Sequence, residues 1–312
     1  MATHHLFDNW FSLLVRYALI RLGINVKLRA RIGDCSFDVS SEVFGRFLSR
    51  FSRGLIKVVK CVDDKLLVND VEISNISDII YKIETWRKIV GWRYDKKIDC
   101  WFRNNIKFKR IYEPIDEIFD DEVYKDVDVR NRFVVDVGAF VGDSAIYFAS
   151  RSAKKVIAVE PQPMAYKEML ENIKLNDLEN MIIPINAGLA SKHSKLCIQD
   201  LDIKSTIATY YKPSDHDVHC SIPQKTLSEL INEYDIGNEP ILKMDCEGCE
   251  YDVILNDFSY VRVFKELIFE YHEYATKMPV KRLLEVLAKD YKCKLIRKKG
   301  IDMGIVHCVR KW

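Results

Sequence analysis

The stretch Phe133–Ser144, FVVDVGAFVGDS, is the part of the sequence that decides the fold. A short apolar run meets an acid, glycines and a polar pair, and the residues SAIYFA follow. This order is typical of a buried strand, a tight loop and the start of a helix. Gly138 and Gly142 can adopt backbone angles that other residues resist. Because Asp143 or Ser144 can cap the helix, we expect the loop to hold a ligand at a helix N-terminus.

The spacing within this loop narrows the choice of ligand. A dinucleotide fingerprint needs GxGxxG, whose middle glycine lets the backbone approach a pyrophosphate. Phe140 occupies that place, which argues against NAD. A second apolar run, Lys155–Val159, leads to Glu160, and a carboxylate there can accept the protons of both ribose hydroxyls. A ribose without a pyrophosphate indicates S-adenosylmethionine.

Ordered motifs in the chain resemble those of the FkbM-type methyltransferase family. They are VVDVGAFVGDSAIYF, VIAVEPQP and LKMDCEGCEYDVI, and the similarity extends from Arg132 to the C-terminus. Several motifs in order are far more specific than one glycine loop. The resemblance implies an α/β fold of the class I methyltransferase type, which is a Rossmann-like, seven-stranded, mostly parallel sheet. It also implies use of S-adenosylmethionine, mostly on hydroxyls of sugars or secondary metabolites.

The donor pocket is predicted to combine the glycine loop, the acid after the second strand and the end of a third strand. Ligands bind at the carboxyl ends of parallel strands, and the run Met181–Ile185 reads as the third strand. Two residues follow it and face the adenosine in this interpretation; the alternative is a polar turn only. The predicted cofactor-binding residues are Asp136, Gly138, Ala139, Gly142, Asp143, Ser144, Glu160, Asn186 and Ala187.

Acids at the ends of the fourth and fifth strands are the candidates for acceptor chemistry. The run Pro240–Met244 leads to Asp245, and Glu247 begins the next helix. Glu270 and His272 lie two residues apart on the fifth strand and therefore point to one side. We predict Asp245, Glu247, Glu270 and His272 as catalytic residues that activate a hydroxyl, directly as a base or through a divalent metal. A metal is not predicted, and acids in a first helical turn also favour the helix dipole.

The cysteines favour packing over chemistry. Cys246 and Cys249 form a CxxC, but no second CxxC or nearby Cys/His pair completes a zinc set. Cysteine as a small hydrophobe is therefore the prediction at both positions. The nine cysteines are scattered, and the chain is too long to need a disulfide framework, so a cytoplasmic location is expected. A thermophilic source with cytosolic disulfides is the alternative.

Composition indicates a soluble globular protein with one large domain and an extension. The chain has 312 residues, of which 48% are hydrophobic and 30% charged. A net charge of +2 gives no field to attract nucleic acid or an acidic membrane. The expected partner is thus a small-molecule or glycan acceptor, and no oligomeric state is predicted.

Residues 1–112 are predicted to form a β-rich accessory region, and residues 113–312 the S-adenosylmethionine-binding domain. The pattern of Asp8–Gly23 predicts a helix. Its arginines interrupt the apolar run, which is therefore too short to span a membrane. It packs on its own domain or a second subunit; the alternative is peripheral membrane contact. Short strands are expected across Leu28–Ile73, a hairpin around Arg103–Asn105, and an extra hairpin within Ser194–Cys220.

Two other functions compete with methyl transfer. The first is a non-catalytic protein that keeps the nucleoside pocket, and the second is a nicotinamide-dependent oxidoreductase. The presence of both Asp136 and Asp245 argues against a dead enzyme, and Phe140 argues against NAD. Heats of binding for S-adenosylmethionine and NAD distinguish these alternatives.

Overall fold

The computed structural model describes residues 6–193 and 222–311. The chain divides into two compact units, Met1–Ile106 and Lys107–Trp312. The second unit was predicted to begin at Glu113, which is the first residue of helix α5 (Glu113–Phe119). The hairpin predicted within Ser194–Cys220 lies outside the described residues.

The first unit is built from short elements around an aromatic and aliphatic core. Its helices are α1 (Trp10–Arg21), α2 (Ser41–Ser52), α3 (Asp78–Tyr81) and α4 (Ile83–Ile89). Its strands are β1 (Leu28–Ile32), β2 (Cys35–Val39), β3 (Val59–Val62), β4 (Lys65–Val68), β5 (Val71–Ile73), β6 (Arg93–Asp95) and β7 (Cys100–Arg103). Strand β8 (Ile106–Phe108) neighbours β7, and Asn104 between them has a φ of 53°, as expected for the predicted hairpin.

Helix α2 corrects the prediction of strands throughout Leu28–Ile73. The Ser40 side chain accepts a hydrogen bond of 3.2 Å from the Val43 N–H, which satisfies an otherwise unpaired donor at the helix start. Val43, Phe44 and Phe47 are buried, and their spacing places them on one helical face. The helix forms because this apolar face covers the core. In a strand, the same residues would not all lie on one face.

Helix α1 agrees with the helix predicted over Asp8–Gly23. Leu13 is its buried residue, whereas the side chains of Phe11 and Leu22 are 79% and 78% exposed. No helix among the described residues combines the length and the apolar character that crossing a bilayer requires. Peripheral membrane contact through this helix stays the untested alternative.

The prediction that the cysteines serve in packing is wrong, since six of the cysteines among the described residues form disulfides. Disulfides join Cys35 to Cys61, Cys246 to Cys249 and Cys293 to Cys308. The last pair lies directly opposite in the register of antiparallel strands, where side chains come close. Periodicity and composition carry no information on such pairing, which depends on the tertiary fold. The expected cytoplasmic location stays a prediction.

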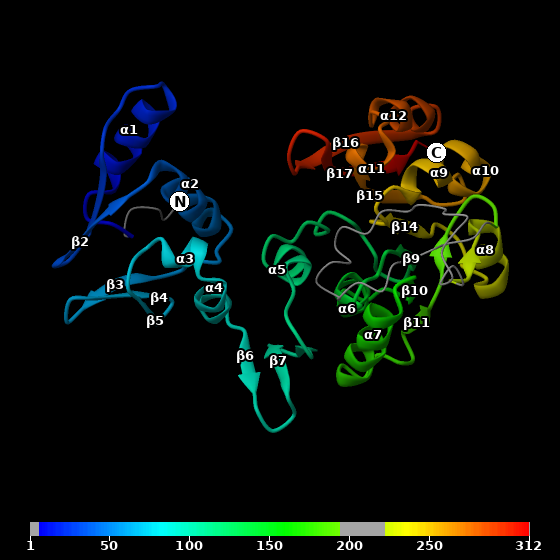
Figure 1. The fold of residues 1–312 in the computed structure, drawn as a ribbon, viewed down its shortest axis with the longest axis horizontal. Helices are drawn as coiled ribbons and strands as arrows, with labels where there is room; N and C mark the ends of the chain where they lie inside the picture. The colour runs from blue at the N-terminus through cyan, green and yellow to red at the C-terminus, as the bar shows by residue number, and fades with distance from the viewer. Residues whose placement is uncertain (1–5, 194–221, 312) are drawn as a thin grey trace, which may run out of the picture. The chain divides into compact units, whose positions relative to one another are not determined.

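The second unit contains a seven-stranded sheet in the order β11-β10-β9-β14-β15-β17-β16 (Figure 1). Its strands are β9 (Phe133–Val137), β10 (Lys155–Val159), β11 (Ile182–Ile185), β14 (Ile241–Met244), β15 (Glu266–His272), β16 (Tyr291–Lys298) and β17 (Met303–Arg310). Pairings from β11 to β15 are parallel, and the hairpin of β16 and β17 adds antiparallel strands. The predicted mostly parallel sheet of the class I methyltransferase type is confirmed.

Helices cover both faces of this sheet. The helices of this unit are α5, α6 (Asp143–Ser150), α7 (Pro163–Leu175), α8 (Leu227–Tyr234), α9 (Cys249–Asn256), α10 (Phe258–Val261), α11 (Glu273–Thr276) and α12 (Lys281–Leu287). Two short strands, β12 (Gly188–Leu189) and β13 (Gln224–Lys225), pair with each other outside the sheet. The chain moves outward from β9 through β10 to β11, and in the opposite direction from β14 to β15. Because such crossovers are right-handed, α6 and α7 cover one face and α9 the other, and Figure 1 shows these two groups apart. The order reverses between β9 and β14, where α/β proteins bind ligands.

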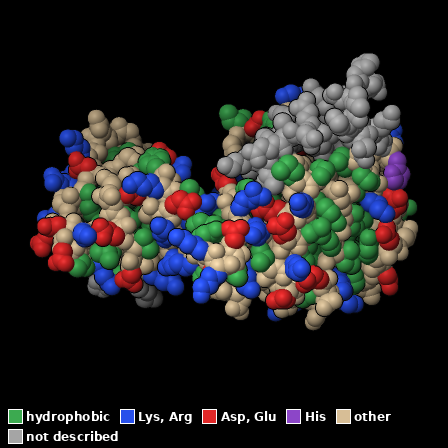
Figure 2. Space-filling view, turned by 60° about the horizontal axis from the view of Figure 1, so that its bottom comes forward, with side chains coloured by type: hydrophobic (Ala, Val, Ile, Leu, Met, Phe, Trp, Pro, Cys, Tyr) green, Lys and Arg blue, Asp and Glu red, His purple; other side chains and the backbone are tan. Residues whose placement is uncertain are grey.

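Acidic and basic side chains are interspersed on the face seen in Figure 2. This mixing agrees with the formal net charge of +2. Interactions between exposed charges that lie more than about one Debye length apart, roughly 8–10 Å, are largely screened by salt. This net charge offers no large field to steer a polyanion.

Candidate active site

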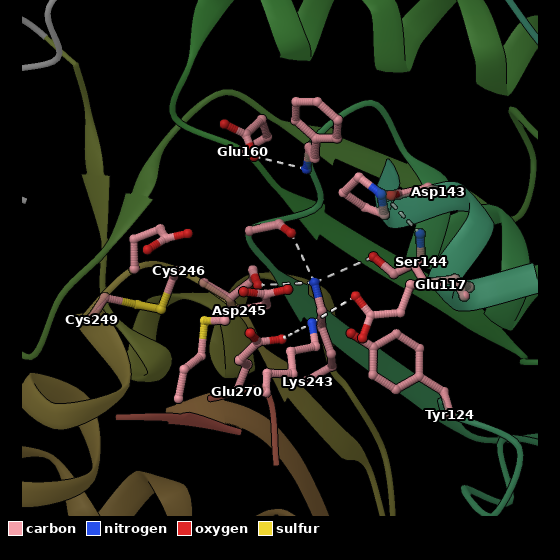
Figure 3. A pocket seen from close by; sticks show the side chains of 18 of the residues that line it. Glu117, Tyr124, Asp143, Ser144, Glu160, Lys243, Asp245, Cys246, Cys249 and Glu270 are labelled. Atoms are coloured by element: carbon pink, nitrogen blue, oxygen red, sulfur yellow. Dashed lines mark hydrogen bonds and ion pairs between the residues drawn. A yellow bond between two sulfur atoms is a disulfide. The ribbon is translucent and has the colours of Figure 1, made fainter. Parts of the chain in front are cut away.

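A cavity of about 670 Å³ opens at the carboxyl ends of the parallel strands (Figure 3). Its size falls within the roughly 300–1,000 Å³ of small-molecule sites. One side, called the loop wall, comes from residues within 137–144 and 160–162, after β9 and β10. The other side, called the acid wall, comes from Asp245, Glu247 and Glu270, after β14 and on β15. Both walls belong to the unit that starts at Lys107.

The loop after β9 is held by close backbone contacts. The N–H groups of Gly138 and Ala139 donate hydrogen bonds of 2.9 and 3.1 Å to the Val159 carbonyl. Gly138 has a φ of 72°, and a Cβ there would lie 1.8 Å from the Asp245 carbonyl oxygen. Only glycine fits, and the loop can thus pass directly over the end of β14.

Beneath the loop lies a buried ion pair that joins two central strands. Asp136, on β9, is fully buried, and its Oδ1 lies 2.9 Å from the Nζ of Lys243 on β14. Its Oδ2 accepts a hydrogen bond of 2.7 Å from the Ser144 hydroxyl. Lys243 also donates to the Gly138 carbonyl at 2.8 Å (Figure 3). Asp136 does not line the cavity, and its carboxylate instead fixes the floor under the loop.

Lys243 is a site residue that sequence reasoning missed. Burial opposes its charge, but Asp136 and Asp245 raise the pKa of its ammonium above the ordinary value. The signal was present, since a lysine stands inside the apolar run PILKM. A buried lysine requires a buried acid, and Asp136 on the neighbouring strand meets that need.

Glu160 projects from the end of β10 onto the loop wall. Its Oε2 accepts a 2.8 Å hydrogen bond from the Phe140 N–H (Figure 3). Its Oε1 accepts one of 2.8 Å from the Gln162 N–H. Burial raises the pKa of Glu160 to about 7, although these backbone hydrogen bonds favour the charged form. Each carboxylate oxygen has a further lone pair for a ligand.

Asp143 supplies an unsatisfied acceptor on the same wall. Its side chain is 2% exposed, and Oδ1 accepts a 3.0 Å hydrogen bond from the Ser144 N–H. Oδ2 is buried and has no hydrogen-bond partner among residues 6–193 and 222–311. Burial raises the pKa of Asp143 to about 7, against the effect of Lys243. Leaving such an atom unpaired costs about 1–3 kcal/mol, which a ligand N–H would offset.

The remaining predicted binding residues lie behind the cavity surface. Asn186 donates hydrogen bonds from Nδ2 to the carbonyls of Glu160 and Pro161, at 2.9 and 3.2 Å. Ala139, Gly142 and Ala187 do not line the cavity, whereas Gly188 and Leu189 do. Asn186 therefore positions the Glu160 turn, and the chain after β11 reaches the cavity in β12, two residues later than predicted.

The acid wall gathers carboxylates around one imidazole. His272 is 1% exposed, and its Nε2 lies 3.7 Å from Asp245 Oδ1, 3.7 Å from Glu247 Oε2 and 3.8 Å from Glu270 Oε1. The four predicted catalytic residues are thus brought together, although they come from the β14–α9 turn and from β15. Glu247 has a φ of 54°, an uncommon backbone angle that turns the chain at the cavity.

Glu250 completes the cluster from below. It is fully buried, and its Oε1 accepts hydrogen bonds of 3.0 Å from both the backbone N–H and Nδ1 of His272. Burial alone would lower the pKa of His272, but the hydrogen bond to Glu250 and the nearby carboxylates raise it to about 10. We call Asp245, Glu247, Glu250, Glu270 and His272 the acid cluster.

The carboxylates of this cluster differ in their ionisation. Burial raises the pKa of Glu247 to about 7, and burial together with Asp245 raises that of Glu270 to about 7. Burial opposes ionisation of Asp245 as well, but Lys243, His272 and Lys299 hold the pKa of Asp245 below its ordinary value. Asp245 is therefore the carboxylate that stays charged across the neutral range.

Lys299 and Glu117 also line the cavity, and neither was predicted. Lys299 Nζ lies 2.7 Å from Glu270 Oε2 and 2.6 Å from Glu117 Oε2. Lys299 follows β16 and pairs with both acids, so it links helix α5 to the acid wall. No sequence motif links positions so far apart. Cys246 and Cys249 line the wall as a disulfide, which corrects the prediction of separate packing residues (Figure 3).

Comparisons with known proteins give a consistent result. Residues 136–293 match the model of the methyltransferase FkbM domain. A relative, methyltransferase sdnD of Sordaria araneosa, is 27% identical over 169 residues, which are 44% of this chain and 65% of that protein. The chain therefore spans slightly less than two thirds of the length of this relative.

Solved structures with a similar fold include methyltransferase FkbM from Methylobacillus flagellatus, with 16% identity, a TM-score of 0.41, and coverage of 64% of this chain and 48% of that one. The O-methyltransferase of Bacillus cereus, solved with SAH, has 14% identity, a TM-score of 0.36, and coverage of 58% and 74%. The family model covers half of the sequence and includes the residues of both walls. The chain thus belongs to the methyltransferase FkbM domain family.

Proposed function

We propose that this protein is an S-adenosylmethionine-dependent methyltransferase that acts on a hydroxyl of a sugar, glycan or small metabolite. The observation that carries the proposal is one cavity with two different walls. The loop wall has acceptors for a nucleoside and an ammonium group, and the acid wall has groups that accept a proton. Membership of the FkbM domain family supports the same reaction.

The loop wall fits the methyl donor in its charges. Glu160 faces the cavity with free lone pairs, as recognition of ribose hydroxyls requires. The unpaired Oδ2 of Asp143 is an orphaned acceptor, which suits the ammonium of an amino acid moiety. Phe140 lines the cavity where a pyrophosphate would need bare backbone. These residues would hold S-adenosylmethionine, with Asn186 fixing the Glu160 turn.

When bound, S-adenosylmethionine supplies a methyl group that is already activated by its positive sulfur. The protein's own residues need to place the acceptor oxygen in line and accept its proton. Asp245 suits this task because its side chain is 35% exposed toward the cavity and stays charged at neutral pH. His272 and Glu270 lie within 4 Å of each other beside it.

The acid wall favours a hydroxyl acceptor over a planar nitrogen. Nitrogen methyltransferases commonly hold an amide or base with an NPPY-like motif after the fourth strand, and this chain has MDCE there. A hydroxyl is a weak nucleophile until its proton has a destination, and a positioned carboxylate provides one. We therefore assign the acceptor to the class of alcohols.

Calorimetric titrations test this proposal against its alternatives. S-adenosylmethionine and its demethylated product are each titrated into the full chain, with NAD as the control. We expect heat from the first two ligands and none from NAD at the same concentration. Binding of NAD alone would support the oxidoreductase. Donor binding without transfer of a labelled methyl group to any glycan, lipid or metabolite fraction would support the non-catalytic nucleoside-binding protein.

A further inference from the structure

We propose that Asp245, Glu270 and His272 bind one divalent first-row transition-metal ion at the acid wall. One ligand atom from each of these side chains lies within 4.8 Å of the others. Metal bonds of about 2.0–2.3 Å place the ligand atoms of a single ion roughly 3–4.5 Å apart. Shifts of a few tenths of an ångström would close the set around an ion.

The imidazole of His272 is oriented as a metal ligand. Its Nδ1 is held by Glu250 Oε1 at 3.0 Å, and both side chains are buried. Metal-binding histidines usually donate this second ring N–H to a carboxylate, which fixes the tautomer and directs the other nitrogen at the metal. Nε2 of His272 therefore points toward the acid wall, where a bound metal ion would displace its proton.

The atoms around Nε2 are too distant for hydrogen bonds. Its carboxylate neighbours Asp245, Glu247 and Glu270 lie at 3.7, 3.7 and 3.8 Å, whereas a hydrogen bond needs about 2.7–3.2 Å. Nε2 has no hydrogen-bond partner within the described ranges 6–193 and 222–311. A polar nitrogen in a residue that is 1% exposed is thus aimed at a centre surrounded by carboxylate oxygens.

The charges of the acid cluster also call for a cation. Four carboxylates lie near the single imidazole. Lys299 reaches the cluster through Glu270 Oε2 at 2.7 Å, but it also pairs with Glu117. Glu270 Oε1, the oxygen nearer to His272, remains directed at the centre. A divalent ion would balance this surplus of negative charge.

The donor set selects among metals. Imidazole suits transition metals such as Zn²⁺, whereas Mg²⁺ and Ca²⁺ prefer oxygen ligands alone. One nitrogen and two carboxylates therefore favour Mn²⁺ or Zn²⁺ over Mg²⁺. The partial exposure of Asp245 leaves coordination positions open to the cavity. An alcohol in such a position would have its pKa lowered; this role rests on the proposed function, whereas binding of the ion itself does not.

Metal titrations without donor or acceptor test the site. Mn²⁺ binding is followed by loss of the free-ion electron paramagnetic resonance signal, and Zn²⁺ and Mg²⁺ are added as competitors. We expect one Mn²⁺ per chain, displacement by Zn²⁺, and weaker displacement by Mg²⁺. Asp245→Asn and His272→Gln are expected to weaken Mn²⁺ binding by at least about tenfold, and Glu250→Gln, which positions His272, by about 10–100-fold.

Glu113→Gln is the matched control, because Glu113 is an exposed carboxylate that lines the same cavity outside the cluster. It is expected to bind Mn²⁺ within about twofold of the parent protein. His272→Gln alone could lose metal binding because it misfolds. Asp245→Asn tests the same site with less disturbance, because Asp245 is partly exposed and asparagine keeps the side-chain shape. Absence of Mn²⁺ and Zn²⁺ binding, or equal loss in Glu113→Gln and Asp245→Asn, would overturn the inference. Metal binding without donor binding would instead contradict the proposed function alone.

Discussion

The two walls of the cavity satisfy their polar groups in different ways. On the loop wall, Glu160 is bonded to backbone N–H groups, and Asp136 below it is bonded to Lys243 and Ser144 at 2.7–2.9 Å. On the acid wall, carboxylates face His272 Nε2 at 3.7–3.8 Å, beyond hydrogen-bond range. Apart from Asp143 Oδ2, the loop wall is therefore preorganised by the protein itself. On the acid wall, the carboxylate oxygens that face His272 Nε2 have room between them for a proton, a cation or a substrate. This difference separates a binding surface from a reacting one.

The largest expected effect belongs to the acid wall. Asp245→Asn keeps the side-chain shape but removes the charge that receives the acceptor proton. Methyl transfer should fall by about 10²–10⁴-fold, because a positioned base typically contributes that factor. The measurement is transfer of a labelled methyl group to the identified acceptor at saturating donor. Normal turnover in this variant would make the carboxylate structural and remove the proposed distinction between the walls.

The buried ion pair of Asp136 and Lys243 is expected to affect the free energy of unfolding more than the chemical step of methyl transfer. Lys243→Met leaves Asp136 buried without its partner, which typically costs about 3–5 kcal/mol in the free energy of unfolding. Urea unfolding of the single variant is compared with the double variant Lys243→Met with Asp136→Asn, which removes both charges. We expect the double variant to recover part of the loss. If the single variant were as stable as the parent, the floor of the loop wall would not depend on this pair.

A smaller effect is expected from pH. The pKa values of Glu160 and Asp143 are raised to about 7 by burial, so both are largely protonated at pH 6 in the free protein. A protonated carboxyl one unit below its pKa must ionise to accept the donor's protons, which costs about tenfold in affinity. Donor binding should therefore strengthen from pH 6 to pH 8 by about tenfold for each carboxyl, or up to about 100-fold when both must ionise. Titrations at several pH values check this, and in Glu160→Gln only the part that depends on Asp143, about tenfold, should remain.

The sequence predicted the central sheet because its strands are apolar runs that end in glycines or acids. Phe133–Val137, Lys155–Val159 and Ile241–Met244 carry this pattern, and local periodicity is enough to find them. The positions of Asp245, Glu270 and His272 at neighbouring strand ends followed from the rule on parallel strands. Four members of the acid cluster could thus be placed together from the sequence, whereas Glu250, which holds His272 Nδ1, was not among the predicted catalytic residues.

Features that depend on distant contacts were not predictable in this way. Lys299 and Glu117 form an ion pair although they lie 182 positions apart in the sequence, and no pattern near either residue indicates this pair. The pairing of Cys35 with Cys61 likewise depends on where β2 and β3 lie in the folded unit. Lys243 is the intermediate case: a charge in an apolar strand signals a buried partner without identifying it.

The most direct test of the account is the affinity for the demethylated donor in one matched pair of variants, Glu160→Gln and Asp245→Asn. In Glu160→Gln, the amide offers one acceptor oxygen where the carboxylate meets two backbone N–H groups. Loss of charge-assisted hydrogen bonds, at about 1.5–3 kcal/mol, should weaken binding by about 10- to 100-fold. Asp245→Asn should bind within a few fold of the parent. The opposite ranking, with Asp245→Asn weakened and Glu160→Gln unchanged, would contradict the assignment of donor and acceptor to the two walls.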